Sequence, residues 1–76
     1  MDAKSRVCET FFNRFANLHD QSGWSINKLA DISGLDRSTI INYRQRKHTP
    51  NAVSVAVIAE AFGVSTDWLL GVGEWR

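Results

Sequence analysis

Apolar side chains recur at helical spacing along most of the chain. The first stretch carries an apolar stripe at intervals of four, four and three residues: Val7, Phe11, Phe15 and Leu18. This spacing puts the four side chains on one face of a helix, which we predict over residues 4 to 19. Residues 20 to 23 are predicted to form the first turn.

Two further helices are predicted in the second half of the chain. A strongly apolar one runs from Pro50 to Phe62, where a proline in the first position loses no hydrogen bond. Gly63 ends it, and a short helix capped by Ser65 follows, ending at Gly71. β-Branched residues do not alternate with polar ones as they do in a half-buried strand.

Residues 25 to 46 have the pattern of two more short helices joined by a tight turn. Ser25 is a favourable N-cap for the first of them, and Asp36 for the second. Gly34 lies between them at a position that requires positive φ, which glycine adopts at little cost. Three residues of the first helix are predicted to be buried: Leu29, Ala30 and Ile32. The sequence therefore predicts a helix-turn-helix motif inside an all-α domain of five short helices, with a tail over residues 72 to 76.

The second helix of the motif has two different faces. Steps of about 100° per residue put Ile40 and Tyr43 on its inner side. The outer side carries mostly hydrogen-bonding side chains: Arg37, Ser38, Ile41, Asn42 and Gln45. In the major groove, arginine can bond to guanine O6 and N7, and asparagine or glutamine to adenine N6 and N7. The outer face therefore predicts a helix that reads DNA.

The motif resembles the lambda-repressor/Cro-like family of DNA-binding proteins. The resemblance rests on a small–glycine–aliphatic–apolar spacing: Ala30, Gly34, Ile40 and Tyr43. It continues through Pro50 to the segment AEAFGVSTDWLLG, and so covers most of the chain. One position departs from the family, which often has glycine just after the recognition helix, where this sequence has Arg46.

The resemblance also implies which residues contact DNA bases, namely Arg37, Ser38 and Asn42. Ile41 lies between them, where it is predicted to meet a thymine methyl group; the alternative is contact with a neighbouring helix. Phosphate contacts position a protein without encoding sequence. They are predicted for groups at the rim of the motif: Asn27, Lys28, Gln45, Arg46, Lys47 and Thr49. For Arg44 the sequence leaves open whether it faces DNA or pairs with an acid on another helix.

The distribution of charge supports a nucleic-acid partner, although the net charge is only +1. Between Arg37 and Ala59 the chain has no acid and four cationic side chains: Arg37, Arg44, Arg46 and Lys47. A local basic stripe on a nearly neutral domain is a sufficient electrostatic footprint for DNA. The alternative is a solvated loop that happens to carry several charges.

Other classes of function find little support. The 76 residues, 43% of them hydrophobic, make one small domain without room for an enclosed catalytic cavity beside the core. Cys8 and His19 lie about 16 Å apart along one helix, too far to act together, so no enzyme is expected. No spacing indicates a metal site, and no cofactor or small-molecule ligand is expected. No apolar run approaches the roughly 18 residues of a membrane span, and no signal peptide is recognisable. With a single cysteine as well, the cytoplasm of a bacterial host is the expected location.

We therefore expect residues 1 to 76 to form a single helix-turn-helix DNA-binding domain of a transcriptional repressor. The ending DWLLGVGEWR resembles the segment that follows phage repressor DNA-binding domains, which favours the N-terminal half of a temperate-phage repressor. The alternatives are a complete Cro-like protein, an antitoxin-type regulator, or a protein-interaction module on the same scaffold. The expected partner is a double-stranded operator with an inverted repeat, bound by a weak homodimer that forms on DNA. Its dimer surface is predicted from apolar residues that the fold does not need: Val53, Val57 and Trp68, with Trp75 in the tail.

Overall fold

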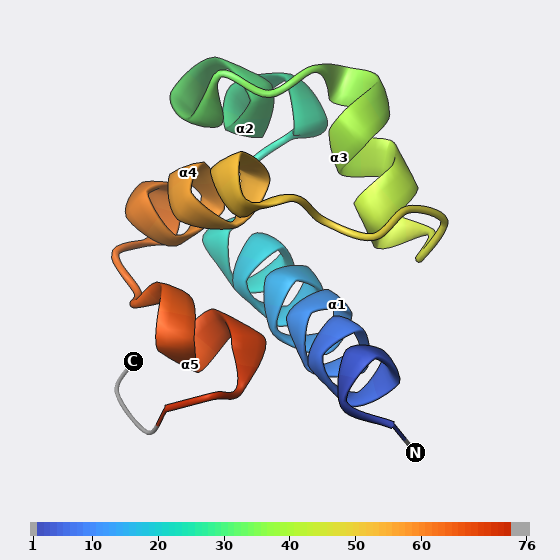
Figure 1. The fold of residues 1–76 in the computed structure, drawn as a ribbon. Coiled ribbons are helices and arrows are strands. Elements are labelled where there is room, and N and C mark those ends of the chain that lie inside the picture. Colours follow the sequence, from blue (N-terminus) through green and yellow to red (C-terminus); the bar gives the residue numbers. More distant parts are fainter. Residues whose placement is uncertain (1, 74–76) are drawn as a thin grey trace.

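The computed structural model of the protein describes residues 2 to 73, and within them it is all-helical, as predicted. The helices in chain order are α1 (Ala3–Ser22), α2 (Ile26–Ser33), α3 (Arg37–Arg44), α4 (Ala52–Phe62) and α5 (Thr66–Leu70). α2 and α3 lie together at one end of the molecule, and α5 lies at the other (Figure 1). α1 packs against both α3 and α5, and α4 packs against both α2 and α5 (Figure 1).

The first helix is longer than predicted, because it continues through Ser22 instead of ending at residue 19. The predicted turn over residues 20 to 23 is therefore wrong. Asp20 and Gln21 are tolerated in a helix, and the Ser22 hydroxyl donates to the His19 carbonyl at 2.7 Å inside the last turn. Gly23, with a φ of 71°, is the first residue that leaves helical geometry.

The fourth helix begins later than predicted, since Pro50 lies outside it. Asn51 is the N-cap, and its side chain accepts a hydrogen bond from the Ser54 amide at 2.8 Å. The Asn51 side chain thereby satisfies one of the N–H groups that the first turn of a helix leaves without an intrahelical partner. Pro50 instead restrains the extended approach to the cap.

The local signals of the motif are confirmed at the start of α2 and in its turn. The Ser25 hydroxyl accepts from the Lys28 amide at 3.0 Å, and Gly34 has a φ of 77°. Asp36 occupies the N-cap position of α3, but its side chain makes no capping hydrogen bond. The predicted burial of Ile32 is wrong, because 41% of this residue is exposed. α2 has only eight residues, and its inner face is already filled by Leu29, which is fully buried.

The core holds α3 against α1 through aromatic contacts. Its buried hydrophobic residues are Phe11, Phe15, Leu18, Leu29, Ile40, Tyr43, Val55, Ile58, Ala59 and Leu69. The ring of Tyr43 stands edge-on to Phe11, with centroids 5.5 Å apart, and to Phe15 at 6.3 Å. Full burial of a phenylalanine or isoleucine contributes roughly 1.5–3 kcal/mol. The inner face of α3 is thus fixed by Ile40 and Tyr43, and this fixes the direction of the outer face.

Candidate nucleic-acid interface

The outer face of α3 carries the side chains predicted to contact bases. Arg37 and Ser38 are exposed at its first turn, and Ile41 and Asn42 are half-buried one turn later. Because Ile40 and Tyr43 are almost fully buried, the predicted separation of the two faces is present in the structure. Ile41 is only partly covered, so both the thymine contact and the contact with a neighbouring helix remain compatible with its position.

Asn42 and Thr49 line the same polar hollow, between α3 and the start of α4. The backbone carbonyl of Asn42 also accepts the Lys47 amide at 2.9 Å, which ties the loop back to the end of α3. The structure therefore brings together one predicted base contact and two predicted phosphate contacts, although they come from different segments.

Apart from Arg46, the predicted phosphate contacts come from the segments before and after α3. Asn27 and Lys28 are exposed in the first turn of α2, and Gln45, Lys47 and Thr49 are exposed after α3. No ion pair within residues 2 to 73 involves Arg37, Lys28 or Lys47. These three cations are therefore available for an anionic partner.

Arg44 is not available in the same way, because it faces α1. Its guanidinium lies 2.9 Å from the Asp20 carboxylate and also donates to His19 Nδ1 at 2.7 Å. His19 Nε2 lies 2.9 Å from the Trp24 carbonyl, which can only accept, so we assign the ring proton to Nε2. Of the two alternatives for Arg44, the ion pair with another helix is the one present. His19 and Asp20 thereby acquire a role that their own sequence neighbourhood did not indicate.

Arg46 is also drawn toward α1. Its guanidinium lies 2.9 Å from the Glu9 carboxylate, donates to the Asn13 side chain, and lies 6.0 Å from the centre of the Phe12 ring. About half of the Arg46 and Glu9 side chains is exposed, so this ion pair lies at the surface. Glu9 and Asn13 are four residues apart on one helix face, so a single guanidinium can reach both.

The backbone of Arg46 takes the conformation that glycine has at the other helix ends. Its φ is 59°, and it is the only residue other than glycine with positive φ between residues 2 and 73. The Arg46 amide bonds to the Tyr43 carbonyl at 3.2 Å and the Lys47 amide to the Asn42 carbonyl at 2.9 Å. These are the two hydrogen bonds of a Schellman motif. α4 ends with the same pair of bonds around Gly63, where the φ is 67°.

The residues predicted to form a dimer surface line different hollows. Val53 is 70% exposed, and the half-buried Val57 lines a hollow with Ile32 between α2 and α4. Trp68 lines a different hollow with residues of α1, and Arg14 lies 4.5 Å above its ring. Trp68 also packs against the core. Trp75 lies outside the described residues.

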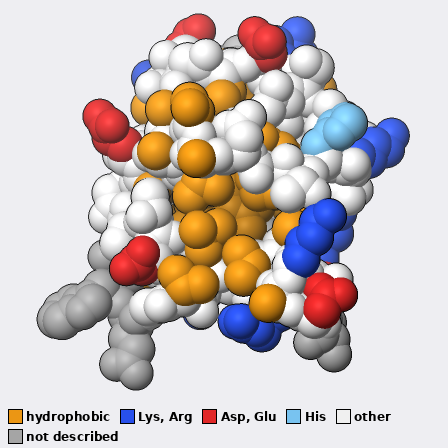
Figure 2. All heavy atoms as spheres, viewed as in Figure 1, with side chains coloured by type: hydrophobic (Ala, Val, Ile, Leu, Met, Phe, Trp, Pro, Cys, Tyr) orange, Lys and Arg blue, Asp and Glu red, His pale blue; other side chains and the backbone are white. Residues whose placement is uncertain are grey.

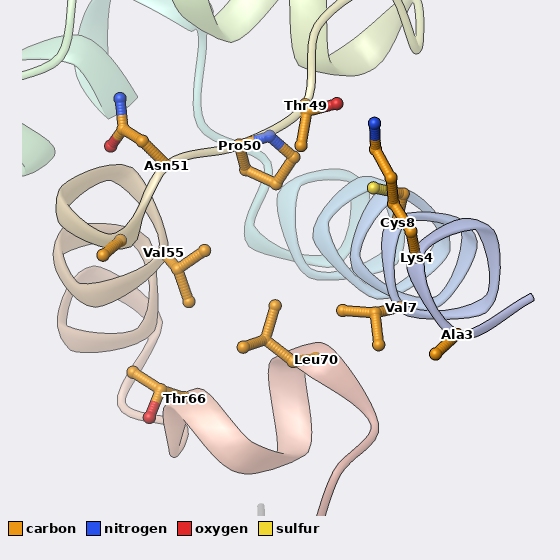
Figure 3. Close-up of a pocket in the computed structure, with 11 residues that line it drawn as sticks. Ala3, Lys4, Val7, Cys8, Thr49, Pro50, Asn51, Val55, Thr66 and Leu70 are labelled. Atoms are coloured by element: carbon orange, nitrogen blue, oxygen red, sulfur yellow. The ribbon is translucent and has the colours of Figure 1, made fainter.

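A further hollow of about 650 Å³ opens between the start of α1, the loop before α4, and α5. Val7, Pro50, Val55 and Leu70 line it, and Lys4 is the only charged residue among the described residues that line it (Figure 3). Figure 2 shows hydrophobic side chains gathered at the centre of this face. Ligand sites usually combine such a surface with several convergent polar groups.

Among the described residues, no three His, Cys, Asp or Glu side chains lie close enough to hold a metal, and no helix is long and apolar enough to cross a membrane.

The geometry of two helices around a glycine turn, with a polar outer face on the second, defines a helix-turn-helix domain. A family model described as "Helix-turn-helix domain" matches residues 13–72, and the chain belongs to this family, of the Cro and lambda repressor kind.

A curated relative is the HTH-type transcriptional regulator AnsR of Bacillus subtilis (strain 168). The two are 30% identical over 59 residues, which cover 78% of this chain and 51% of AnsR. The chain therefore matches about half the length of that relative. No solved structure matches the chain at a significant level.

Proposed function

We propose that this domain binds a specific double-stranded DNA sequence by placing α3 in the major groove. The observation that carries the proposal is the outer face of α3, where Arg37 and Ser38 are exposed while Ile40 and Tyr43 anchor the helix from behind. In this family of motifs the second helix enters the groove with its N-terminal residues toward the bases.

Arg37 and Asn42 would supply most of the sequence preference. Arg37 stands at the first position of α3 with no acid paired to it within residues 2 to 73, so its two parallel donors are available for guanine O6 and N7. Asn42 can pair with adenine N6 and N7, while Ser38 can bond to any base. Ile41 would contact a thymine methyl group beside them.

Groups on either side of α3 would hold the backbone of the DNA. Asn27 and Lys28 at the start of α2 face one strand, and Gln45, Lys47 and Thr49 after α3 face the phosphates beyond it. Such contacts supply most of the affinity and make it dependent on salt. Arg46 was predicted to join them, but its guanidinium is held against α1 by Glu9 and Asn13.

The regulator would act as a repressor in the cytoplasm of a bacterial host, as the DNA-binding half of a temperate-phage repressor. A complete Cro-like protein or an antitoxin-type regulator would use the same surface. The protein-interaction alternative is less well supported, because the outer face of α3 presents arginine, serine and asparagine rather than acids or a broad apolar patch.

The test is a selection from random duplexes, followed by titration of the selected duplex and a scrambled one at several salt concentrations. The proposal predicts one enriched motif and an affinity that falls with salt by a slope of about −0.9 for each phosphate contacted. Equal affinity for all duplexes, or no dependence on salt, would contradict it.

The operator would be an inverted repeat occupied by a weak homodimer. One recognition helix reads only a few base pairs, so two copies with half-sites about 10–10.5 base pairs apart, or a multiple, are needed for specificity. Val53 and Val57 on α4 are the better placed part of the predicted dimer surface, with Ile32 beside Val57. Trp68 would belong to it only if the contact extended around α5.

The dimer surface can be tested on duplexes with one and two half-sites. Val57→Glu should abolish cooperative binding to two half-sites and leave the affinity for one half-site nearly unchanged. Ala56→Glu, which adds the same charge to an exposed neighbouring position, serves as the control. Trp68→Ala examines the second part of the predicted surface separately. If Val57→Glu leaves cooperativity intact, the dimer contact must lie elsewhere.

A further inference from the structure

We infer that Arg46 is a positioning residue for the DNA-binding loop, which comprises residues 47 to 51, and not itself a phosphate contact. This inference rests on the proposed function, since it concerns how that loop is presented to DNA. Arg46 is the last residue before the loop, and Lys47 and Thr49 follow within three positions. Any change in the backbone of Arg46 therefore redirects both predicted phosphate contacts.

The backbone of Arg46 sets the direction in which the loop leaves α3. Its left-handed conformation allows the Lys47 amide to reach back to the Asn42 carbonyl at 2.9 Å. An arginine has a Cβ atom and resists this conformation, whereas glycine adopts it freely. The chain holds an unfavourable backbone geometry at the point where the loop begins, so something else has to stabilise it.

The side chain of Arg46 contributes to that stabilisation through its contacts with α1. One guanidinium nitrogen donates to Glu9 at 2.9 Å, and the other donates to Asn13, one helical turn further along. The planar guanidinium uses both terminal nitrogens on the same helix face, an arrangement that a lysine could not reproduce. To reach a phosphate, Arg46 would have to give up Glu9, which already neutralises its charge.

Exchanging the two charges separates the two possible roles of Arg46. We compare Arg46→Glu, Glu9→Arg, and the variant with both changes, on the duplex selected by the wild-type protein. The single changes place like charges side by side, while the double variant restores an ion pair of reversed polarity and the original net charge. A carboxylate at position 46 can hold the loop, but it can't bind a phosphate.

If Arg46 positions the loop, Arg46→Glu weakens binding because the redirected loop loses a phosphate contact. The salt slope then falls by about 0.9, the value of one such contact, and the double variant recovers both the affinity and the slope. A double variant as weak as Arg46→Glu would overturn the inference, because it would show that the cation itself touches DNA. Single variants that melt at lower temperature but bind with unchanged affinity would also overturn it, by limiting Arg46 to a role in stability. If the wild-type protein selects no duplex, the proposed function fails instead.

A second comparison uses Glu9→Gln and does not reverse any charge. A positioning role predicts that this variant binds no more tightly than Glu60→Gln, which changes the net charge equally at an exposed site on α4. In the free protein, it should also speed hydrogen exchange of the Lys47 amide relative to Glu60→Gln. Tighter binding with a steeper salt slope in Glu9→Gln alone would mean that Glu9 competes with phosphate for Arg46, and would overturn the inference.

Discussion

The four cations of the segment from Arg37 to Lys47 fall into two pairs with opposite surroundings. Arg44 and Arg46 face α1, where each forms an ion pair at 2.9 Å, with Asp20 and Glu9 respectively. Arg37 and Lys47 are exposed and form no ion pair within residues 2 to 73. A count of charges along the sequence therefore gives four cations in this segment, of which the structure leaves two without an ion pair. The acids of α1 determine which of them contribute to the fold and which to binding.

A comparison of the ends of α3 and α4 bears on the role of the contacts between Arg46 and α1. Both ends have the same two backbone hydrogen bonds, but Gly63 supplies the left-handed residue in one and Arg46 in the other. This conformation costs an arginine about 1–2 kcal/mol, and an exposed ion pair returns only about 0.2–1 kcal/mol. Arg46 therefore adds little to stability, which agrees with the positioning role inferred for it.

The largest expected effect is on stability, at Arg44. Arg44→Ala leaves the Nδ1 of His19 without its donor, and His19 is only 7% exposed. The loss of a partner for a buried acceptor costs about 1–3 kcal/mol, to which the ion pair with Asp20 adds at most about 1 kcal/mol. Urea denaturation should show this loss, while Arg37→Ala changes the free energy of unfolding by less than about 0.5 kcal/mol. Equal effects of the two variants would contradict the division into two pairs.

The next effect concerns sequence preference, at Arg37. Arg37→Ala should weaken binding to the selected duplex by roughly 1–3 kcal/mol and relax the preference at one base pair. A repeat of the duplex selection measures both. Lys47→Ala is the matched variant, and it should weaken all duplexes about equally. If the two variants gave the same specificity profile, the assignment of readers and backbone contacts would be wrong.

The smallest effects are those at the two helix ends. A Cβ atom at Gly63 would meet nothing within 4 Å, so Gly63→Ala should cost about 1 kcal/mol for backbone conformation alone. Arg46→Gly removes a similar cost but loses the contacts with α1 and loosens the unfolded chain, so its stability should stay within about 1 kcal/mol of the wild type. Thermal denaturation of both variants checks this. A loss in Arg46→Gly larger than in Gly63→Ala would show that the α1 contacts are mainly structural.

Features that depend on a few neighbouring residues were predictable from the sequence. The cap at Ser25, the turn at Gly34 and the two faces of α3 follow from spacing and from the properties of single residue types. The errors at the end of α1 and at Pro50 concern helix boundaries, where a favourable cap such as Asn51 decides between neighbouring positions. The exposure of Ile32 could not be predicted, because it depends on how far α4 covers a helix of eight residues.

The ion pairs of Arg44 and Arg46 depend on tertiary packing. Their partners lie more than 20 positions away in the sequence, and they meet only because Tyr43 packs α3 onto Phe11 and Phe15 of α1. No local pattern distinguishes these arginines from Arg37. The sequence therefore located the basic segment but not the separation of its cations into two pairs.

The most direct test of this separation is the dependence of DNA affinity on salt for Lys47→Ala and Arg44→Ala, measured on the same selected duplex. Each variant removes one positive charge from the same short segment. If only the unpaired cation meets phosphate, Lys47→Ala lowers the slope of log affinity against log salt by about 0.9, and Arg44→Ala, measured where it is fully folded, leaves the slope unchanged. Equal slopes for the two variants would contradict the account.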